Sequence, residues 1–277
     1  MILIADSGST KTDWCISAQG KQLQRITTIG LNPYFLQEEE VSEVIRTSLL
    51  PELQTGTFEA LYFYGAGCLP EKFPMMQSAL GKHLELKTIE VNSDMLAAAR
   101  GLSGKNPGIV CIMGTGSNSC YYDGKQIVSN VSPLGFILGD EGSGAVLGKL
   151  LVGDLLKNQL PAGLKEKFLQ EFDLTPATII ERVYRQPFPN RFLASLSPFL
   201  KQNIEVPEIH ALVLDAFKVF LNRNVKQYAD YKKHKVHFIG SVAYHYKEVL
   251  EEAIHSTGMQ LGSIMQNPME GLVKYHC

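Results

Sequence analysis

The first 30 residues alternate short apolar runs with small polar turns. Residues 2–5 form an apolar run typical of a buried strand, and residues 6–10 are small and polar. Residues 13–17 and 22–28 resume an extended pattern on either side of Gln19-Gly20. This spacing predicts an antiparallel meander of three strands joined by tight turns.

The same order of elements returns after residues 103–108, whose Ser, Gly and Pro content predicts a linker. Residues 109–113 predict an apolar strand, residues 114–117 a turn, and residues 119–122 and 126–131 two further strands. A repeated unit of this kind predicts two similar domains that face each other across a cleft.

Helices and further strands complete the pattern. In the first half we expect helices over 41–50, over 74–83 and from Asp94 onward, and strands over 61–64 and 86–91. Residues 142–225 are mostly helical, with interruptions at Phe188-Pro189 and Ser197-Pro198. A strand over 236–239, a helix over 242–254 and a strand over 261–265 follow, and a last helix begins with Asn267 as cap and Pro268 at its first position.

Composition places the chain among soluble globular proteins. Of its 277 residues 45% are hydrophobic and 19% are charged, and the net charge is -2. This balance lacks the basic surplus that nucleic acid or a membrane surface requires, so we expect neither as a partner. No apolar run reaches the ~20 residues of a membrane span, and the N-terminus lacks the pattern of a signal peptide. We therefore expect a cytoplasmic protein.

The five cysteines have an odd count and no CxxC spacing. This argues against a disulfide framework and against a structural zinc site. We expect most of them to be small core residues.

The first chemical candidate is the hairpin between the first two strands. Gly8 allows the backbone to approach a polyphosphate closely, Ser9 and Thr10 offer N–H and hydroxyl groups, and Lys11 offers charge. Asp6 ends a buried strand, where a carboxylate can hold Mg²⁺ through water. An ordinary polar β-turn is the alternative interpretation.

A second turn of small residues, Gly114-Thr115-Gly116-Ser117-Asn118, opens the second repeat. Either turn alone is a weak signal. Two such hairpins, each at the start of a domain-like unit, suit a cleft that binds phosphates from both sides.

Three further segments offer candidate chemistry. Asp140 and Glu141 are flanked by glycines and can accept hydrogen bonds from hydroxyl groups, although acids at a helix N-terminus also favour the helix dipole. Asp94 starts a helix, where its carboxylate can accept a proton from a hydroxyl nucleophile. The alternative is that Asn92 or Ser93 caps this helix and Asp94 only occupies its first turn.

The last candidate is Gly240-Ser241-Val242-Ala243, between a strand and a helix. Its glycine leaves room for a flat adenine ring or a ribose. A plain strand-to-helix turn is the alternative.

In this order the five segments resemble the superfamily of acetate and sugar kinases, heat-shock chaperones and actin. Within it the chain resembles the N-acetylglucosamine kinase and BadF-BadG-BcrA-BcrD ATPase family, most specifically in GTGSN at 114–118 and GDEGS at 139–143. The resemblance implies an α/β fold of two ribonuclease H-like domains, with mixed sheets flanked by helices and an interdomain cleft. Residues 1–104 and 267–277 would form the N-terminal actin-like ATPase domain, and residues 105–266 the C-terminal domain with a helical insertion.

The resemblance also implies roles for individual residues. Asp94 is the catalytic base and Asp6 the Mg²⁺ residue. The ATP phosphates are bound by Gly8, Ser9, Thr10, Lys11, Thr12, Gly114, Thr115 and Gly116. Adenosine is bound by Gly240, Ser241 and Ala243. The sugar is bound by Asn32, Gly65, Ala66, Asp94, Ser117, Asn118, Asp140 and Glu141. The sequence departs from the family pattern at two places. The first loop has Ser7 where many relatives have glycine, and the adenosine segment has one glycine, Gly240, where two glycines are common.

These roles describe an ATP-dependent kinase for an amino sugar, with N-acetylglucosamine expected first, that acts as a homodimer. Two alternatives remain open. A BadF-type ATPase that activates a partner enzyme needs exposed thiolates for an iron–sulfur cluster, whereas Cys111 and Cys120 lie in apolar strands. A non-catalytic nucleotide-dependent regulator has no need of both Asp6 and Asp94.

Overall fold

The computed structural model describes residues 1–8, 10–53 and 57–276. The chain divides into two compact units. Unit 1 comprises Met1–Asn106, Asp123–Ile127 and Asn267–Cys277, and unit 2 comprises Pro107–Tyr122 and Val128–Gln266. Unit 1 is therefore assembled from three separate stretches of sequence.

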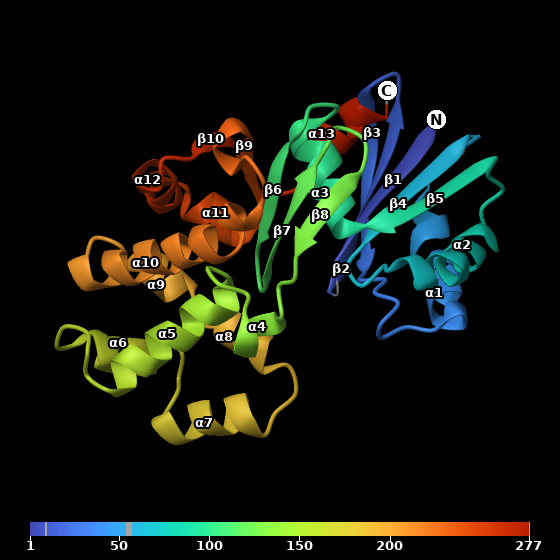
Figure 1. Cartoon of the computed structure of the whole chain (residues 1–277). Helices are drawn as coiled ribbons and strands as arrows, with labels where there is room; N and C mark the ends of the chain where they lie inside the picture. The colour runs from blue at the N-terminus through green and yellow to red at the C-terminus, as the bar shows by residue number, and fades with distance from the viewer. Residues whose placement is uncertain (9, 54–56, 277) are drawn as a thin grey trace. The chain divides into compact units, whose positions relative to one another are not determined.

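Unit 1 contains a five-stranded mixed sheet in the order β3-β2-β1-β4-β5 (Figure 1). Its strands are β1 (Ile2–Ser7), β2 (Lys11–Ala18), β3 (Lys21–Ile29), β4 (Ala60–Gly65) and β5 (Thr88–Ser93). β2 runs antiparallel to β1 and β3, whereas β4 runs parallel to β1 and β5. The carboxyl ends of β1, β4 and β5 therefore meet at one edge of the sheet, where Ser7, Gly65 and Ser93 are in register.

Helices cover both faces of this sheet (Figure 1). They are α1 (Glu38–Val44), the π-helical η1 (Ile45–Leu49), the 3-10 turns η2 (Leu50–Glu52) and η3 (Pro70–Lys72), α2 (Phe73–Gly81), α3 (Asp94–Ser103) and α13 (Met269–Tyr275). Because side chains alternate along a strand, Leu3 faces the core under α1 and α2, while Ile4 faces the core with Ala97 of α3 and Leu272 of α13.

Unit 2 repeats this topology. Its sheet has the order β10-β9-β6-β7-β8, formed by β6 (Gly108–Met113), β7 (Ser117–Tyr122), β8 (Ile127–Val131), β9 (Lys235–Ile239) and β10 (Gln260–Met265). β6 pairs antiparallel with β7 and parallel with β9, as β1 does with β2 and β4. The duplication predicted from the sequence is confirmed at the level of strand order and direction.

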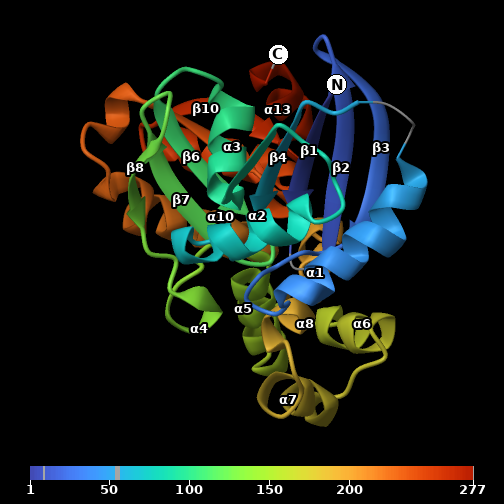
Figure 2. The ribbon, with the colours of Figure 1, turned by 90° about the vertical axis from the view of Figure 1, so that its right-hand side faces the viewer.

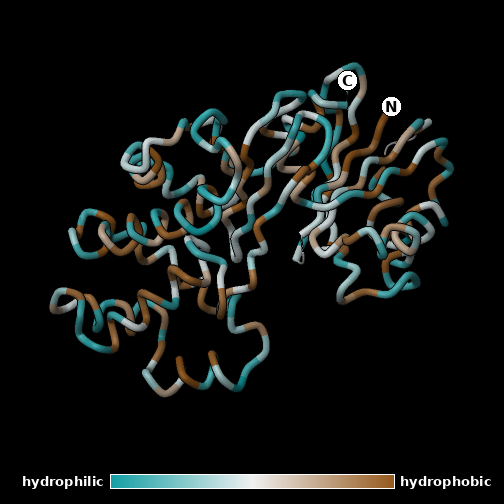
Figure 3. Tube along the Cα trace, viewed as in Figure 1, coloured by the Kyte–Doolittle hydropathy of each residue, from teal (hydrophilic) through white to brown (hydrophobic). Residues whose placement is uncertain are grey.

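The helices of unit 2 enclose one large core. They are α4 (Gly135–Leu138), α5 (Gly144–Leu156), α6 (Leu164–Glu171), α7 (Pro176–Tyr184), α8 (Pro189–Leu196), α9 (Pro198–Gln202), α10 (Pro207–Arg223), η4 (Val225–Gln227), η5 (Tyr231–Lys233), α11 (Ser241–His245) and α12 (Lys247–Ser256). Figure 2 shows α5 beside α8, where Gly148 lies against the carbonyl of Leu193. Figure 3 shows hydrophobic and hydrophilic positions alternating along α10, whose Ile209, Val213 and Phe217 are buried at helical spacing.

The predicted interruptions at Phe188-Pro189 and Ser197-Pro198 are confirmed, because α7 ends at Tyr184 and α8 at Leu196. Pro189 and Pro198 each begin the next helix, since proline has no N–H to lose in the first turn and its φ already suits a helix. Among the described residues, no helix combines the length and the apolar character that a bilayer span requires.

Candidate active site

The hairpin between β1 and β2 is closed by backbone hydrogen bonds. The Gly8 N–H donates to the Lys11 carbonyl at 2.9 Å, and the Gly30 N–H donates to the Thr10 carbonyl at 3.0 Å. Ser9, which the sequence assigned to ATP phosphates, lies outside the described residues. Lys11 extends its ammonium to Asp13, with 2.7 Å between Nζ and Oδ2. The hairpin therefore carries a cation at an exposed position.

Two aspartates stand at the carboxyl edge of the unit 1 sheet. Asp6 is the penultimate residue of β1 and is in register with Tyr64 on β4. Asp94 is the first residue of α3, which follows β5 directly, and its Oδ1 accepts the Met95 N–H at 2.8 Å. Ser93 caps α3 by accepting the Leu96 N–H at 3.3 Å, which confirms that the cap lies at this predicted point.

Burial makes both carboxyl groups harder to ionise. It raises the pKa of Asp6 to about 7, and the nearby carboxylates of Asp94 and Asp13 add to the rise while Lys11 opposes it. Burial also raises the pKa of Asp94 to about 6, against the lowering effect of backbone N–H groups of Met95 and Asp94. The edge thus holds two buried carboxyl groups that are less readily ionised than ordinary aspartates.

The Asp6 carboxyl group suits a magnesium ion. Mg²⁺ prefers oxygen ligands, keeps several waters, and is commonly held by one or two carboxylates together with substrate phosphates. The described residues contain no cluster of three or more His, Cys, Asp and Glu side chains placed to hold a metal by themselves. Asp6 therefore fits the ion through water and phosphate better than as part of a closed protein site.

Asn32 and the Gly65–Gly67 loop lie against each other in unit 1. Asn32 is 7% exposed, and its Oδ1 accepts the Tyr34 N–H at 2.9 Å. A Cβ on Gly67 would collide with that same Oδ1, and Gly67 has φ +73°. The structure thus brings together the predicted sugar residue Asn32 and the loop that contains Gly65 and Ala66, and Gly67, the third residue of this glycine-rich segment, makes the contact.

In unit 2 the small-residue turn after β6 contacts the start of α5. The Gly114 carbonyl accepts the Gly144 N–H at 2.8 Å, and the Thr115 carbonyl accepts the Ala145 N–H at 3.1 Å. Ser143 caps α5 by accepting the Val146 N–H at 3.2 Å. The second predicted phosphate loop is therefore fixed to the helix that follows the GDEGS segment.

Asp140 lies directly against this turn. A Cβ on Gly116 would come within 2.9 Å of the Asp140 Oδ2, so only glycine leaves room for the carboxylate. Burial raises the pKa of Asp140, while the Ser117 backbone N–H, which donates to it, lowers it. Ser117 also donates its hydroxyl to the Glu141 carbonyl at 2.8 Å. The predicted sugar residues Asp140 and Ser117 are thus neighbours.

Glu141 and Asn118 have protein partners of their own. Glu141 pairs with Arg223 of α10 and accepts the Asn224 Nδ2 at 3.1 Å. Burial would raise the pKa of Glu141, but hydrogen bonds from its own backbone, Asn224 and Arg223 bring the pKa below its usual value. Asn118 accepts the Ser119 N–H at 2.8 Å through Oδ1. Glu141 is a link to α10, and its role toward a sugar stays a prediction.

The Gly240 turn lies beside the end of β6. Gly240 has φ +116°, and a Cβ there would collide with the Met113 carbonyl, the residue before Gly114. Ser241 is exposed, whereas Ala243 is fully buried in the core. The predicted adenosine turn and the second phosphate loop are therefore adjacent, and Ala243 supports the turn from below rather than presenting its side chain to solvent.

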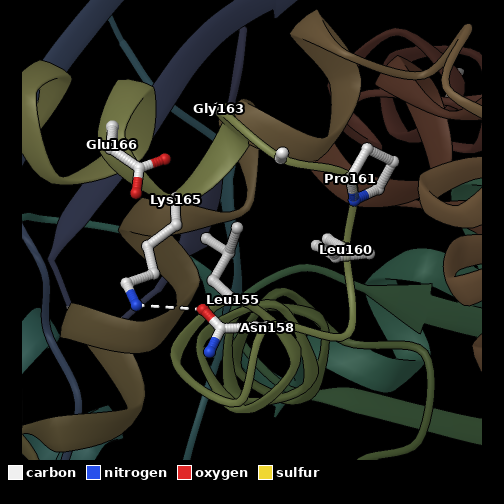
Figure 4. Close-up of a pocket in the computed structure, with 8 residues that line it drawn as sticks. Leu155, Asn158, Leu160, Pro161, Gly163, Lys165 and Glu166 are labelled. Atoms are coloured by element: carbon white, nitrogen blue, oxygen red, sulfur yellow. Dashed lines mark hydrogen bonds between the residues drawn. The ribbon is translucent and has the colours of Figure 1, made fainter.

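A separate depression lies between the end of α5 and the start of α6 (Figure 4). Its volume is about 300 Å³, and Leu155, Leu160 and Pro161 are among the residues that line it. Lys165 crosses one side and donates to Asn158 Oδ1 at 3.0 Å (Figure 4). None of the predicted site residues lines this depression, which lies at the opposite end of α5 from Gly144.

Comparison with known proteins decides the family. No protein-family model matches the chain, and no curated protein does. A solved structure from Porphyromonas gingivalis, provisionally named N-acetylglucosamine kinase, covers 100% of this chain and 98% of its own, with 56% identity and a TM-score of 0.96. The chain belongs to the N-acetylglucosamine kinase family.

More distant structures show the fold of this N-acetylglucosamine kinase family. A protein from Chromobacterium violaceum, also provisionally named N-acetylglucosamine kinase, matches with 16% identity and a TM-score of 0.76, covering 99% of both chains. A ROK-family glucokinase from Streptomyces griseus, in complex with glucose and AMPPNP, matches with 13% identity and a TM-score of 0.56, covering 99% of this chain and 97% of its own. The predicted two-domain sugar-kinase fold is thereby confirmed.

Proposed function

We propose that this protein is an ATP-dependent kinase that phosphorylates a hydroxyl group of N-acetylglucosamine or a related amino sugar. The observation that carries the proposal is the placement of Asp94 and Asp6 at one edge of the unit 1 sheet, next to the β1–β2 hairpin. The proposal is supported by the 56% identity to the Porphyromonas gingivalis protein over the whole chain.

The proposed reaction is a direct transfer. A sugar hydroxyl oxygen forms a bond to the γ-phosphorus of ATP, the bond to the β–γ bridging oxygen breaks, and ADP leaves. The proton of the hydroxyl goes to the Asp94 carboxylate. Because its pKa is raised to about 6, Asp94 is mostly ionised at neutral pH and is a stronger base than an ordinary aspartate.

In this proposal the predicted site residues bind three parts of the substrates: the phosphates of ATP, its adenosine and the sugar. Gly8, Thr10 and Lys11, together with Gly114, Thr115 and Gly116, bind the phosphates through backbone N–H groups and side chains. Thr12 is buried and donates its hydroxyl to the Ile29 carbonyl, so its side chain supports the hairpin. The Gly240–Ser241 turn receives adenosine. Asn32, Gly65, Ala66, Ser117, Asn118 and Asp140 bind the sugar hydroxyl groups.

Magnesium completes the nucleotide substrate in this proposal. When bound, it neutralises charge on the phosphates of ATP. Asp6 would orient it through coordinated water. The ammonium of Lys11 adds positive charge on the same hairpin.

Replacing Asp94 with asparagine separates chemistry from binding. Asp94→Asn keeps the size of the side chain and the oxygen that accepts the Met95 N–H, but it cannot accept the proton. We expect kcat to fall by about 10²–10⁴, with the Kd for MgATP unchanged by calorimetry. Asp215→Asn, at an exposed position on α10, is the matched control. An Asp94→Asn variant with wild-type turnover would contradict the assignment of the base.

The same variant tests the regulator alternative, because nucleotide binding by a non-catalytic sensor would be unchanged in Asp94→Asn.

The ATPase-activator alternative needs thiolates that converge at a surface. The four cysteines among the described residues, Cys15, Cys68, Cys111 and Cys120, are all buried and free, and burial raises the pKa of each thiol. Cys277 lies outside the described residues. We therefore favour the kinase.

A further inference from the structure

Ser7, the last residue of β1, is buried and joins three parts of unit 1. It is 1% exposed. Its Oγ lies 2.8 Å from the Thr12 Oγ1 and accepts the Leu31 N–H at 2.9 Å. Its carbonyl accepts the Ala66 N–H at 2.8 Å. Ser7 therefore contacts the hairpin, the segment before Asn32 and the Gly65–Gly67 loop.

The direction of this hydrogen-bond chain follows from counting protons. Thr12 has one hydroxyl proton, and it donates that proton to the Ile29 carbonyl at 3.0 Å. Thr12 then accepts from Ser7. The other acceptor in reach of the Ser7 hydroxyl, the Gly8 carbonyl, is farther away at 3.4 Å, so the shorter contact makes Ser7 the donor to Thr12. The chain runs from the Leu31 N–H through Ser7 and Thr12 to the Ile29 carbonyl, and every proton in it has a partner.

Both ends of this chain lie on one short segment. Ile29 and Leu31 are held by the hydroxyl groups of Thr12 and Ser7, and Gly30 between them donates its N–H to the Thr10 carbonyl at 3.0 Å. The next residue is Asn32. The hairpin thus fixes the backbone that presents Asn32 from one side.

The second side of Asn32 is fixed through the Ser7 backbone. The Ser7 carbonyl holds Ala66, and the following residue, Gly67, packs against the Asn32 side chain closely enough to exclude a Cβ. Asn32 therefore lies between two segments that both hydrogen-bond to Ser7.

We propose that Ser7 is a positioning residue that sets the affinity for the sugar by holding Asn32, an inference that rests on the proposed function. A residue without a hydroxyl at this position could not accept the Leu31 N–H. Without that hydroxyl the hairpin keeps its backbone bond from Gly8 to Lys11, and Thr12 keeps its bond to the Ile29 carbonyl. Loss of the hydroxyl therefore affects the sugar more than the nucleotide.

The test is a pair of alanine variants in the same sheet. Ser7→Ala leaves the buried Leu31 N–H without its acceptor. Ser17→Ala removes another buried hydroxyl, one that has no hydrogen-bond partner. With MgATP and N-acetylglucosamine, we expect Ser7→Ala to raise the KM for the sugar about tenfold, with the KM for ATP and kcat near wild-type values. Ser17→Ala should change none of them.

Several outcomes overturn the inference. These are a sugar KM in folded Ser7→Ala that equals the wild-type value, an equal rise in the KM for ATP, or the same rise in Ser17→Ala. Inactivity of the wild-type protein toward every sugar would instead refute the proposed function.

Amide hydrogen exchange of the wild-type protein supplies a measurement that needs neither turnover nor a variant. The Leu31 N–H should be strongly protected, and N-acetylglucosamine should increase its protection further. Exchange of Leu31 at the rate of an exposed peptide would overturn the hydrogen-bond chain on which the inference depends.

Discussion

At the scale of single residues, two glycines allow predicted sugar-binding side chains to lie directly against the backbone. Gly67 is in contact with Asn32, and Gly116 is in contact with Asp140. In both cases a methyl group would occupy the space of a side chain that we assign to the sugar. These contacts give two of the predicted sugar residues their positions.

Gly67→Ala tests the contact with Asn32. The substitution introduces a Cβ against Asn32 Oδ1 and a side chain at φ +73°, so we expect the KM for the sugar to rise and the free energy of unfolding to fall by roughly 1 kcal/mol or more. Steady-state kinetics and chemical denaturation measure both.

Gly104→Ala is the matched control for Gly67→Ala. Gly104 also has positive φ, +60°, but nothing lies within 4 Å of its Cβ position. It should share the loss of stability and leave the KM for the sugar unchanged. Equal kinetic effects in the two variants would show that displacement of Asn32 is not the cause.

The candidate residues themselves follow from the sequence, because small-residue turns and acids after apolar strands form recognisable patterns. Their partners do not follow from it. Arg223 is 82 positions from Glu141, and the sequence does not show that the Ser7 hydroxyl contacts Thr12 and Leu31. Only the folded chain brings these groups together.

At the scale of elements, the strand order of each sheet brings its turns together. β6 and β9 are parallel neighbours with Ile112 opposite Ile239, so the turns that follow them meet at one edge. This is why Gly240 lies against Met113. Apolar runs predict these strands, but β6 is apolar along its whole length, so the pattern does not single out one register.

Gly240→Ala tests the adenosine turn. Its Cβ would collide with the Met113 carbonyl, and relief requires a shift of the turn between β9 and α11. We expect the KM for ATP to rise several-fold with little change in the KM for the sugar. Gly258→Ala, with φ +69° and open space around its Cβ position, is the control. A rise confined to the sugar KM would contradict the assignment.

His237 on β9 contacts a bulge in the neighbouring strand β10. Its Nδ1 accepts the Ser263 N–H at 3.0 Å, and the pairing of β10 with β9 shifts register between Leu261 and Ile264. Gly262 leaves room for the ring, because a Cβ there would come within 2.5 Å of Nδ1. Nothing in the hydrophobic pattern of residues 260–265 predicts this bulge.

The pH dependence of stability should reflect His237. Burial lowers the pKa of His237 to about 4, and Lys235 adds to the effect, so the folded state binds fewer protons than the unfolded state. The stability from keeping this ring neutral is complete above about pH 6.5 and is lost as the pH falls toward about 4. The full loss is on the order of 3 kcal/mol.

His237→Asn keeps an oxygen able to accept the Ser263 N–H but removes the titrating ring. We expect its Tm to decline less than that of the wild type between pH 6.5 and pH 4. His255→Asn, at an exposed position of α12, is the control. Identical pH profiles for His237→Asn and the wild type would contradict the account.

At the scale of the whole molecule, the chain contains one topology twice, and each copy carries part of the proposed chemistry. Unit 1 supplies the candidate base, the candidate magnesium residue and Asn32. Unit 2 supplies the second phosphate loop, Asp140 and the Gly240 turn. The repeat of strand order predicted this duplication, because a similar arrangement of short strands and small turns occurs at residues 2–28 and 109–131. The return of the C-terminal helix α13 to unit 1 through Leu272 and Val273 is a tertiary contact, for which the sequence offered only the family resemblance.

The central claim is tested most directly by release of ADP from MgATP in the presence of separate sugars. The panel is N-acetylglucosamine, N-acetylmannosamine, N-acetylmuramic acid, glucosamine and glucose. The account predicts that an amino sugar, N-acetylglucosamine first among them, strongly stimulates ADP release with formation of one phosphorylated sugar per ADP. A steady hydrolysis of ATP that no sugar stimulates would contradict the kinase and favour an ATPase that acts on a partner protein.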